Sequence, residues 1–450
     1  MNPNLSSSAI QSLLQETLES SLKRGADEAD VLYVQGTSLS LSCRNQTIEE
    51  LERSEGVDLG LRVFKGKRQA IVSTSNLSKE SLTGLVDRAL AMANLVPEDP
   101  FCGLASKEDL AQTYGNYESS DPLEDTEETL VSEALACERA ALAVKGVSKS
   151  EGVEASWGKS LVTLATSTNF YGSYEDSSRS LSAAMIAEKN GKMERDYAFT
   201  CAIYRENMTR PEAVGKEAGE RTVKRLSPKK IQSTKLPIVY DPRVGSSLLG
   251  HLASAINGAS IARGTSFLKD KLNKQLFSEK MMILDDPHIK RGLRSRGFDV
   301  EGITTRPLAV IEDGILKTWI LDLRTARQLN LKTTGHASRG TGGIPHPSVS
   351  NFFMKAGALT PHDLIKSLPR GLYVTELMGS SVNLVTGDYS RGAIGFMIEN
   401  GEITYSVSEV TIAGNLGDMF LNLTPCNDLI HQYGIDVPTL MIEGMTIAGS

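Results

Sequence analysis

The sequence predicts an α+β protein of two domains. The N-terminal domain holds a duplicated helix–strands–helix unit, and the C-terminal domain is rich in β-strands, built as a curved sheet or barrel. Two observations predict this class: one order of helical and alternating patterns occurs twice before residue 228, and the chain after residue 235 carries repeated hairpin signatures. The 450 residues, 40% of them hydrophobic and 23% charged, suffice for two folded cores.

The first unit covers about residues 1–110. Apolar residues recur at helical spacing from Ile10 to Leu22, and Gly25 ends this predicted helix. A second helix is predicted with Ser78 as its N-cap and an apolar face from Leu82 onward. Four short alternating strands are predicted between the two helices: ADVLYV, SLSLSC, VDLGLRVF and RQAIVST.

The second unit, about residues 120–228, repeats this order. Thr126 is the predicted N-cap of its first helix, and Thr209–Glu212 is typical of a capping box that opens the last helix. The predicted strands are VEASW, SLVTLAT, SLSAAMIAE and RDYAFTCAIY. Asn190-Gly191 joins the last two as a two-residue hairpin turn. A duplication is therefore predicted, although many α+β domains share this order without one.

A domain boundary is predicted near Ser227-Pro228, which gives an N-terminal domain of residues 1–228 and a C-terminal domain of residues 235–450. The stretch 221–235 is locally basic, so a nucleic-acid patch is one interpretation. A solvated helix end that runs into a linker is the favoured one, because no aromatic side chains interleave with the charges to stack on bases. The net charge of −7 also argues against direct nucleic-acid contact.

The C-terminal domain begins with a predicted strand, LPIVYD, and a helix near residues 243–260. Asp313-Gly314 and Asn400-Gly401 each predict a hairpin with a type I′ turn. The segment 336–351 between them is rich in Gly, Pro and Ser and is predicted to be a mobile loop. Two similar strand-and-turn sequences, VTIAGN and MTIAGS, lie near the end of the chain.

The chain carries the signature of a cytoplasmic protein. Its N-terminus lacks the basic start and apolar core of a secretory signal, and no apolar run approaches the roughly 20 residues that cross a bilayer. The five cysteines are far apart and form no CxxC pair, which predicts reduced, mostly buried thiols. No membrane contact is expected.

The search for catalytic motifs gives no complete set. None of the six histidines is followed by Glu, and no two are spaced as a zinc helix requires. His336 and His346 lie in the predicted loop, and Asp285–His288 is interpreted as a turn after a strand. GxSxG, phosphate-loop and CxxC motifs are absent from the sequence. His251, on an apolar helix, is either a ligand or a core or interface histidine; a single His cannot hold zinc.

Long segments of the sequence resemble the TldD/PmbA family, formerly described as modulators of DNA gyrase, and in particular its PmbA/TldE-type branch. The longest match is 374–419, which includes the run TGDYSRGAIGF. The others are MERDYAFT (193–200), RLSPKK (225–230), GHLASAINGASIARGTSFLKD (250–270) and LNLKTTGHAS (329–338). The resemblance runs from about Gly25 to the C-terminus and implies the same two-part fold.

The resemblance also implies a division of labour. TldD-type members carry zinc on an HExxxH helix with a Cys ligand near the C-terminus, and PmbA-type members pair with them to cleave unfolded peptides. Here His251 stands near the position of the zinc helix, but its Glu and second His are missing, and Cys426 lies upstream of the family's Cys position. We therefore expect this chain to bind no cofactor, with zinc in a TldD-type partner.

Gly387, Asp388, Tyr389, Ser390 and Arg391 are the predicted substrate- or partner-facing loop, with a structural turn as the alternative. The leading functional hypothesis is a subunit of a heterodimeric TldD/TldE-type zinc metallopeptidase that degrades or processes unfolded peptides, with His251 as the one weak catalytic candidate. The alternative is a homodimeric peptide-binding or regulatory protein without peptidase activity, including one that modulates gyrase.

Overall fold

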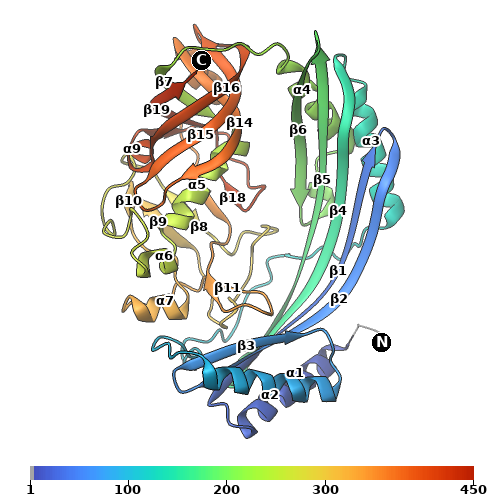
Figure 1. The fold of residues 1–450 in the computed structure, drawn as a ribbon, viewed down its shortest axis with the longest axis vertical. Helices are drawn as coiled ribbons and strands as arrows, with labels where there is room; N and C mark the ends of the chain where they lie inside the picture. The colour runs from blue at the N-terminus through green and yellow to red at the C-terminus, as the bar shows by residue number, and fades with distance from the viewer. Residues whose placement is uncertain (1–4, 450) are drawn as a thin grey trace.

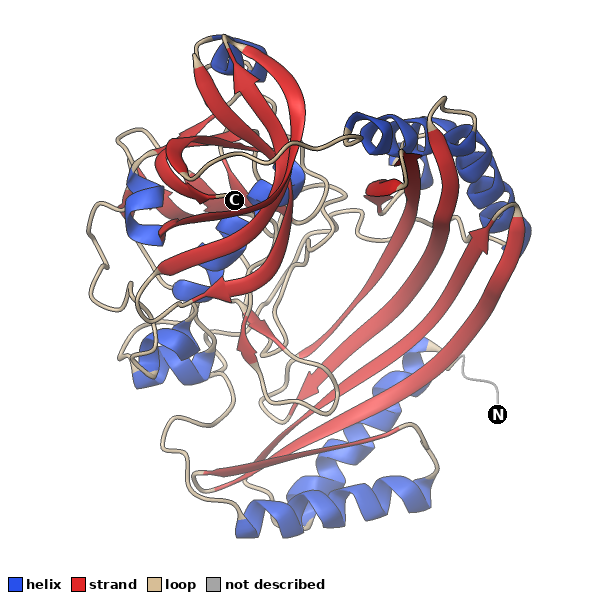
Figure 2. Ribbon diagram, turned by 45° about the horizontal axis from the view of Figure 1, so that its top comes forward, coloured by secondary structure: helices blue, strands red, loops and turns tan. Residues whose placement is uncertain are grey.

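The computed structural model describes residues 5–449 and shows two bodies that face each other (Figure 1). One body is a long curved sheet with helices on its outer face, and the other is a β-barrel with a smaller sheet and loops beneath it (Figure 2). The chain is thus α+β with a barrel-like C-terminal half, as its sequence predicts.

The N-terminal sheet has six antiparallel strands in the order β3-β2-β1-β4-β5-β6, so the central pair β1–β4 joins the two predicted units. The first unit is α1 (Ser7–Lys23), β1 (Glu28–Arg44), β2 (Thr47–Lys65), β3 (Arg68–Thr74) and α2 (Lys79–Leu95). The second is α3 (Glu127–Leu142), β4 (Val147–Thr166), β5 (Tyr171–Lys189), β6 (Lys192–Ala202), the short 3-10 helix η1 (Arg205–Asn207) and α4 (Pro211–Lys224).

Each unit has three strands, so the prediction of four was wrong. ADVLYV and SLSLSC are one strand, β1, and VEASW and SLVTLAT are one strand, β4. Gly36 and Gly158, which stand between the segments predicted as separate strands, lie inside continuous ladders, where Gly36 pairs with Gly56 and Ser160. Pairing on both sides supplies the backbone hydrogen bonds that hold these glycines extended.

The predicted local signals of the N-terminal domain are mostly confirmed. Ser78 accepts a hydrogen bond from the Ser81 N–H at 3.3 Å as the N-cap of α2, and Thr126 caps α3 in the same way. Asn190 and Gly191 both have positive φ, 55° and 76°, as a type I′ turn requires. The capping box at Thr209 was wrong: α4 begins after Arg210 without a side-chain cap, and Pro211 at its first turn sets the start.

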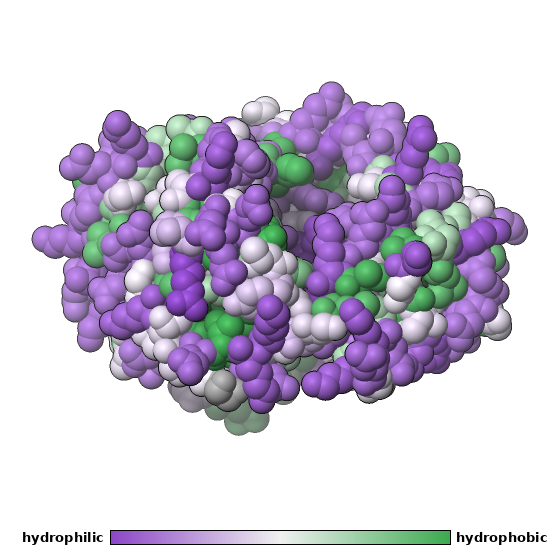
Figure 3. Space-filling model, turned by 90° about the horizontal axis from the view of Figure 1, so that it is seen from above, coloured by the Kyte–Doolittle hydropathy of each residue, from purple (hydrophilic) through white to green (hydrophobic). Residues whose placement is uncertain are grey.

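The sheet uses its two faces differently. Its outer face packs α1 and α2 against one end, through residues such as Tyr33, and α3 and α4 against the other, through residues such as Trp157. Its inner face carries Leu32 and Leu164, which pack with Phe298 of the C-terminal body. In the middle of the inner face, small side chains line an open cavity of about 510 Å³. Seen from above, the hollow between the bodies has a largely hydrophilic rim (Figure 3).

The C-terminal body is a closed barrel of β16-β15-β14-β7-β19, in which β16 and β19 pair to complete the ring. Closure joins the two similar sequences near the end of the chain, because Ile412 of the first pairs with Ile447 of the second. The strands are β7 (Thr234–Tyr240), β14 (Arg370–Val382), β15 (Asp388–Glu399), β16 (Glu402–Asn415) and β19 (Leu440–Ala448), with β17 (Leu423–Pro425) beside β19.

A smaller sheet, β10-β9-β8-β13-β18, lies below the barrel. Its strands are β8 (Ile283–Asp285), β9 (Leu308–Glu312), β10 (Ile315–Leu316), β13 (Phe352–Met354) and β18 (Ile435–Asp436). The helices of this half are α5 (Pro242–Ala255), α6 (Gly258–Ala262), α7 (Leu323–Gln328), α8 (Pro361–Lys366) and α9 (Leu416–Leu421). Both predicted type I′ turns are present, since Asp313, Gly314, Asn400 and Gly401 all have positive φ.

Two predictions for this half need correction. The helix expected near 243–260 is two helices, because Asn257 accepts a hydrogen bond from the Ala259 N–H and starts α6. The segment 336–351, predicted to be a mobile loop, is a packed connection with the hairpin strands β11 (Ala337–Ser338) and β12 (His346–Pro347). His336 within it is buried and contacts Asp285, which fixes the segment to the smaller sheet.

No helix within residues 5–449 is long and apolar enough to cross a membrane. All five cysteines are free thiols, four of them buried, which agrees with the spacing argument.

Candidate functional site

The structure brings together two groups of residues that the sequence singled out. His251 lies on α5, a helix whose N-cap Asp241 accepts from the Arg243 N–H at 3.0 Å and whose apolar face enters the barrel core. Tyr389 and Arg391 lie two residues apart on β15, so their side chains share one face. The rings of His251 and Tyr389 meet edge to face with their centroids 6.1 Å apart.

The two rings differ in their polar contacts. Within residues 5–449, the buried Nε2 of His251 has no hydrogen-bond partner, whereas the buried hydroxyl of Tyr389 meets the hydroxyl of Tyr240. Burial and the Arg391 charge both lower the pKa of His251, so its imidazole is neutral at pH 7. Burial raises the pKa of Tyr389 to about 12. Arg391 is therefore the formal charge at this contact, and it is positive.

These residues do not form a zinc donor set. Leu252 follows His251, and Ile256 lies five residues after it, where the family pattern needs Glu and His. Across the part of the chain that the structure describes, no three His, Cys, Asp or Glu side chains gather closely enough to hold a metal ion. Cys426 packs in a separate apolar cluster, where burial raises its thiol pKa to about 12. A neighbouring guanidinium also disfavours a bound cation.

The predicted loop at 387–391 divides into a turn and a strand. Gly387 has a φ of 83°, and the Thr386 hydroxyl donates to the Asp388 carboxylate at 2.6 Å, so these residues form the tight entry to β15. Tyr389 is buried and Ser390 is half-buried. The structural role of the turn is plain, and the substrate- or partner-facing role of the five residues stays a prediction.

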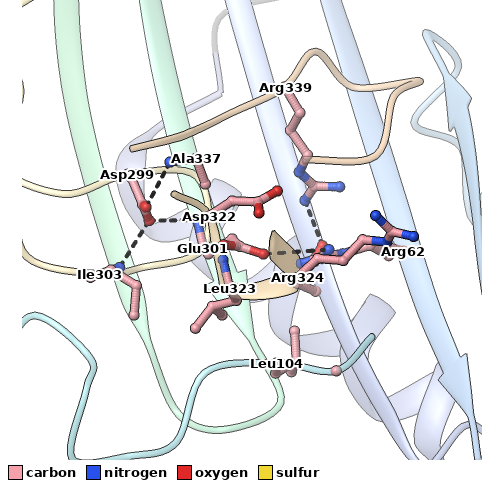
Figure 4. A network of polar contacts seen from close by, with 12 residues as sticks. Arg62, Leu104, Asp299, Glu301, Ile303, Asp322, Leu323, Arg324, Ala337 and Arg339 are labelled. Atoms are coloured by element: carbon pink, nitrogen blue, oxygen red, sulfur yellow. Dashed lines mark hydrogen bonds and ion pairs between the residues drawn. The ribbon is translucent and has the colours of Figure 1, made fainter. Parts of the chain in front are cut away.

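Two buried polar networks join the N-terminal sheet to the C-terminal body. The first, here called the sealed network, consists of Asp30, Arg62, Asp299, Glu301, Asp322 and Arg339 (Figure 4). Arg62 of β2 and Arg339 of the 336–351 segment both pair with Asp30 of β1. The side chains of Arg62 and Asp30 are 3% and 1% exposed, so these charges have left water.

Carboxylates outnumber arginines in the sealed network. Asp299 is held by the N–H groups of Glu301, Ile303 and Ala337, and Asp322 caps α7. Glu301 accepts from the Leu323 N–H at 2.8 Å and lies 4.0 Å from Arg62. Burial and repulsion from Asp299 raise the pKa of Glu301 to about 8, so it carries a proton at pH 7.

The second network, here called the cavity network, consists of Asp196, Arg225, Asp241, Arg243 and Glu376. Asp196 at the edge of the N-terminal sheet pairs with Arg225 at 2.8 Å and with Arg243 of α5 at 3.1 Å. These pairs are also buried, and Asp196, Asp241 and Arg243 form the floor of a cavity of about 580 Å³ between α4 and the barrel.

Sequence reasoning missed both networks. Asp196, Arg225 and Glu376 lie in segments that carry the family resemblance, which was the one available signal for the cavity network. Asp30 and Arg339, 309 residues apart, meet only through the tertiary fold. Asp30 lies in the predicted strand ADVLYV and Arg339 in the predicted loop 336–351, and neither pattern indicates that the two side chains meet.

Three family models match the chain in order. Residues 29–93 match the PmbA/TldA metallopeptidase domain 1, residues 120–226 match the central domain, and residues 233–449 match the C-terminal domain. The metalloprotease PmbA of Escherichia coli O157:H7 is 37% identical over 98% of this chain and 97% of its own length. A metalloprotease PmbA homolog of Haemophilus influenzae is 35% identical over 96% and 94%.

Solved structures share the whole fold. A Bacteroides thetaiotaomicron protein described as a candidate modulator of DNA gyrase superposes with a TM-score of 0.90 at 26% identity, covering 98% of this chain and 99% of that one. TldE from Thermococcus kodakarensis superposes with a TM-score of 0.88 at 20% identity, covering 97% and 100%.

Proposed function

The chain belongs to the PmbA/TldD metallopeptidase family, and from this premise we propose that it is a subunit of a two-chain zinc peptidase that leaves the zinc to a TldD-type partner. The observation that carries the proposal is the donor set on α5: one neutral histidine, His251, beside the positive charge of Arg391. A catalytic zinc site needs about three protein ligands and one open position. This helix offers one.

The zinc in the partner would supply the activated water and the Lewis acid for peptide hydrolysis. This chain would complete the wall around the substrate. The middle of its inner sheet face supports this part of the proposal, because Gly36, Gly56, Gly158 and neighbouring serines leave room for an extended backbone. A surface without bulky side chains suits unfolded peptides of varied sequence.

The experiment compares the chain alone, a TldD-type chain alone and their mixture in a peptidase assay on an unfolded peptide. We expect zinc-dependent cleavage that increases on mixing, and a substoichiometric zinc content for this chain alone. Chelation followed by re-addition of zinc should abolish and restore the activity of the mixture. Robust zinc-dependent cleavage by this chain alone, or one tightly held zinc that His251→Ala releases, would contradict the proposal.

Size measurement by light scattering decides between heterodimer and homodimer. A self-dimer that persists in excess TldD-type chain, with no mixed species, would favour the homodimeric binding protein instead.

A further inference from the structure

The cavity above the cavity network has an apolar wall and a charged rim. Its volume of about 580 Å³ is within the range of small-molecule sites. It lies between the last turns of α4, the barrel strands β14 to β16 and α8, and its floor comes from β6 and the start of α5. The apolar lining residues are Pro361, Ile365, Tyr373, Phe396 and Ile403.

The charges on its floor satisfy one another. Arg243 donates to Asp196 at 3.1 Å and to the Tyr197 carbonyl at 2.8 Å. Asp241 accepts from the Tyr373 hydroxyl at 3.1 Å and lies 3.5 Å from Arg243. The floor carboxylates are therefore occupied, and they leave little negative potential for a cationic ligand.

The cations on the rim keep N–H donors that no acceptor within residues 5–449 uses. Arg221 of α4 pairs with Glu217 through Nη2, but its Nη1 atom is buried and has no partner within residues 5–449. Lys224, one turn further along α4, is exposed and forms no ion pair with any residue in that range. Both side chains line the cavity. A buried guanidinium nitrogen without an acceptor is costly, and an anion in the cavity would satisfy it.

We propose that this cavity binds a carboxylate that carries one apolar group. The carboxylate pairs with Arg221 and Lys224, and the apolar group packs against Tyr373, Phe396 and Ile403. The cation pair at the rim selects the charge, and the aromatic and aliphatic wall selects the body of the ligand. A free small acid and the C-terminal residue of a peptide both have this chemistry, and the experiment separates these two sources.

The site is independent of zinc and of the proposed peptidase role, because none of its lining residues belongs to the α5–β15 contact around His251. A bound carboxylate would contact α4 of the N-terminal body and the barrel at once. Ligand binding should therefore stabilise the arrangement of the two bodies and raise the melting temperature of the full chain.

Isothermal titration calorimetry of the full chain tests the proposal with N-acetyl-phenylalanine and its uncharged amide. We expect the acid to bind at least about tenfold more tightly than the amide, because the amide cannot form the charged pair. Inorganic phosphate is the probe for charge alone. Equal affinity for acid and amide, or phosphate binding as tight as that of the acid, would overturn the proposal.

The variants R221Q and K224Q should each weaken binding of the acid by about fivefold or more. Lys216→Gln is the matched control, because Lys216 is on the same helix, pairs with Glu220 and does not line the cavity. Glutamine retains helix propensity, so all three variants should fold with unchanged melting temperatures. Unchanged affinity in both R221Q and K224Q would refute the site.

Acetylated pentapeptides that end in phenylalanine, with free or amidated C-terminus, identify the source of the ligand. Tighter binding of the free-ended peptide than of N-acetyl-phenylalanine assigns the site to peptide C-termini. Binding of the small acid with exclusion of the peptide assigns it to a free acid. Failure of every probe would overturn the site without touching the zinc proposal, which the peptidase assay tests separately.

Discussion

The sealed network and the cavity network make the same kind of contact in opposite surroundings. Each joins the N-terminal sheet to the C-terminal body through arginine–carboxylate pairs whose side chains are almost entirely buried. The sealed network has four carboxylates around two arginines and is closed by the 336–351 segment. The cavity network has its carboxylates matched, and beside its open volume stand Arg221, whose Nη1 has no acceptor within residues 5–449, and the exposed Lys224.

The difference between the two networks shows how the protein accommodates an excess of buried charge of one sign. Where no solvent reaches, a surplus of negative charge is removed by protonation, and Glu301 holds its proton to about pH 8. Where a cavity adjoins, a surplus of positive charge keeps its ionisation, since an arginine does not lose its proton, and it is left for water or a ligand to satisfy. The first region fixes the two bodies together, and the second can respond to what binds.

The largest expected effect comes from removing the shared acceptor of the sealed network. Asp30→Ala leaves Arg62 and Arg339 buried without their main carboxylate and should cost about 3–5 kcal/mol. Urea unfolding followed by tryptophan fluorescence measures it, because Trp157 and Trp319 report on the N-terminal sheet and the C-terminal body.

The control for Asp30→Ala is Glu55→Ala, which removes an exposed ion pair with Arg53 in the same sheet and should cost less than about 1 kcal/mol. Similar losses of unfolding free energy in both variants would mean that the buried pairs of Asp30 stabilise the protein no more than the exposed pair of Glu55.

The next effect is a dependence of stability on pH. The folded-state pKa of Glu301, about 8, lies above its ordinary value of 4.5, so the folded protein binds this proton more tightly than the unfolded chain does. This contribution is complete below pH 4.5 and is lost as the pH rises through about 8. The Glu301 term should lower the free energy of unfolding by roughly 2–4 kcal/mol between pH 5 and pH 9.

Glu301→Gln cannot ionise and should lack this term, so the difference between the two proteins should grow as the pH rises. Urea unfolding at pH 5, 7 and 9 gives the dependence of the free energy of unfolding on pH for each protein. The same dependence in both proteins would show that Glu301 titrates alike in folded and unfolded chains. Asp299, Asp322 and Arg62 face Glu301 in both proteins.

The residues of each turn were enough to predict it, whereas the extent of the strands depended on pairing with segments far away in the chain. Asn190-Gly191, Asp313-Gly314 and Asn400-Gly401 formed type I′ turns because both residues tolerate positive φ without help from the fold. The strands β1 and β4 were each predicted as two strands, because only strands that lie far away in the sequence hold Gly36 and Gly158 extended. The hairpin signatures predicted a curved sheet or barrel for the C-terminal half, and the pairing of β16 with β19 makes it a closed barrel.

The candidate site was predictable only in part for the same reason. His251 was found as an isolated histidine, and Tyr389 and Arg391 as part of a motif, but their contact follows from the packing of α5 against the barrel. No sequence pattern indicated that Arg221 and Glu301 lie where charges of one sign are in excess. A charged residue on a helix or in a loop is ordinarily solvated, and its burial depends on what the fold places above it.

The third effect tests how the sealed network is closed. The 336–351 segment lies directly on β2, and a Cβ built on Gly60 would stand 2.0 Å from the Thr341 carbonyl oxygen. Gly60→Ala must therefore displace the backbone near Arg339, at a cost of about 1–3 kcal/mol. Gly56→Ala is the matched control four residues away, where nothing lies within 4 Å of the new methyl group. Equal melting temperatures of Gly60→Ala and Gly56→Ala would mean that the 336–351 segment moves away from residue 60 at no cost in stability.

The smallest expected effect concerns the cavity network. Tyr373→Phe removes the hydroxyl that donates to Asp241 at 3.1 Å, on the floor of the cavity. Water in the cavity can replace this donor, so the loss should be about 0.5–1 kcal/mol by urea unfolding, far below that of Asp30→Ala. A loss above about 2 kcal/mol would place Asp241 in surroundings as dry as those of Asp30. The contrast between the sealed network and the cavity network would then fail. If water cannot reach Asp241, a ligand has no path to Arg221 and Lys224.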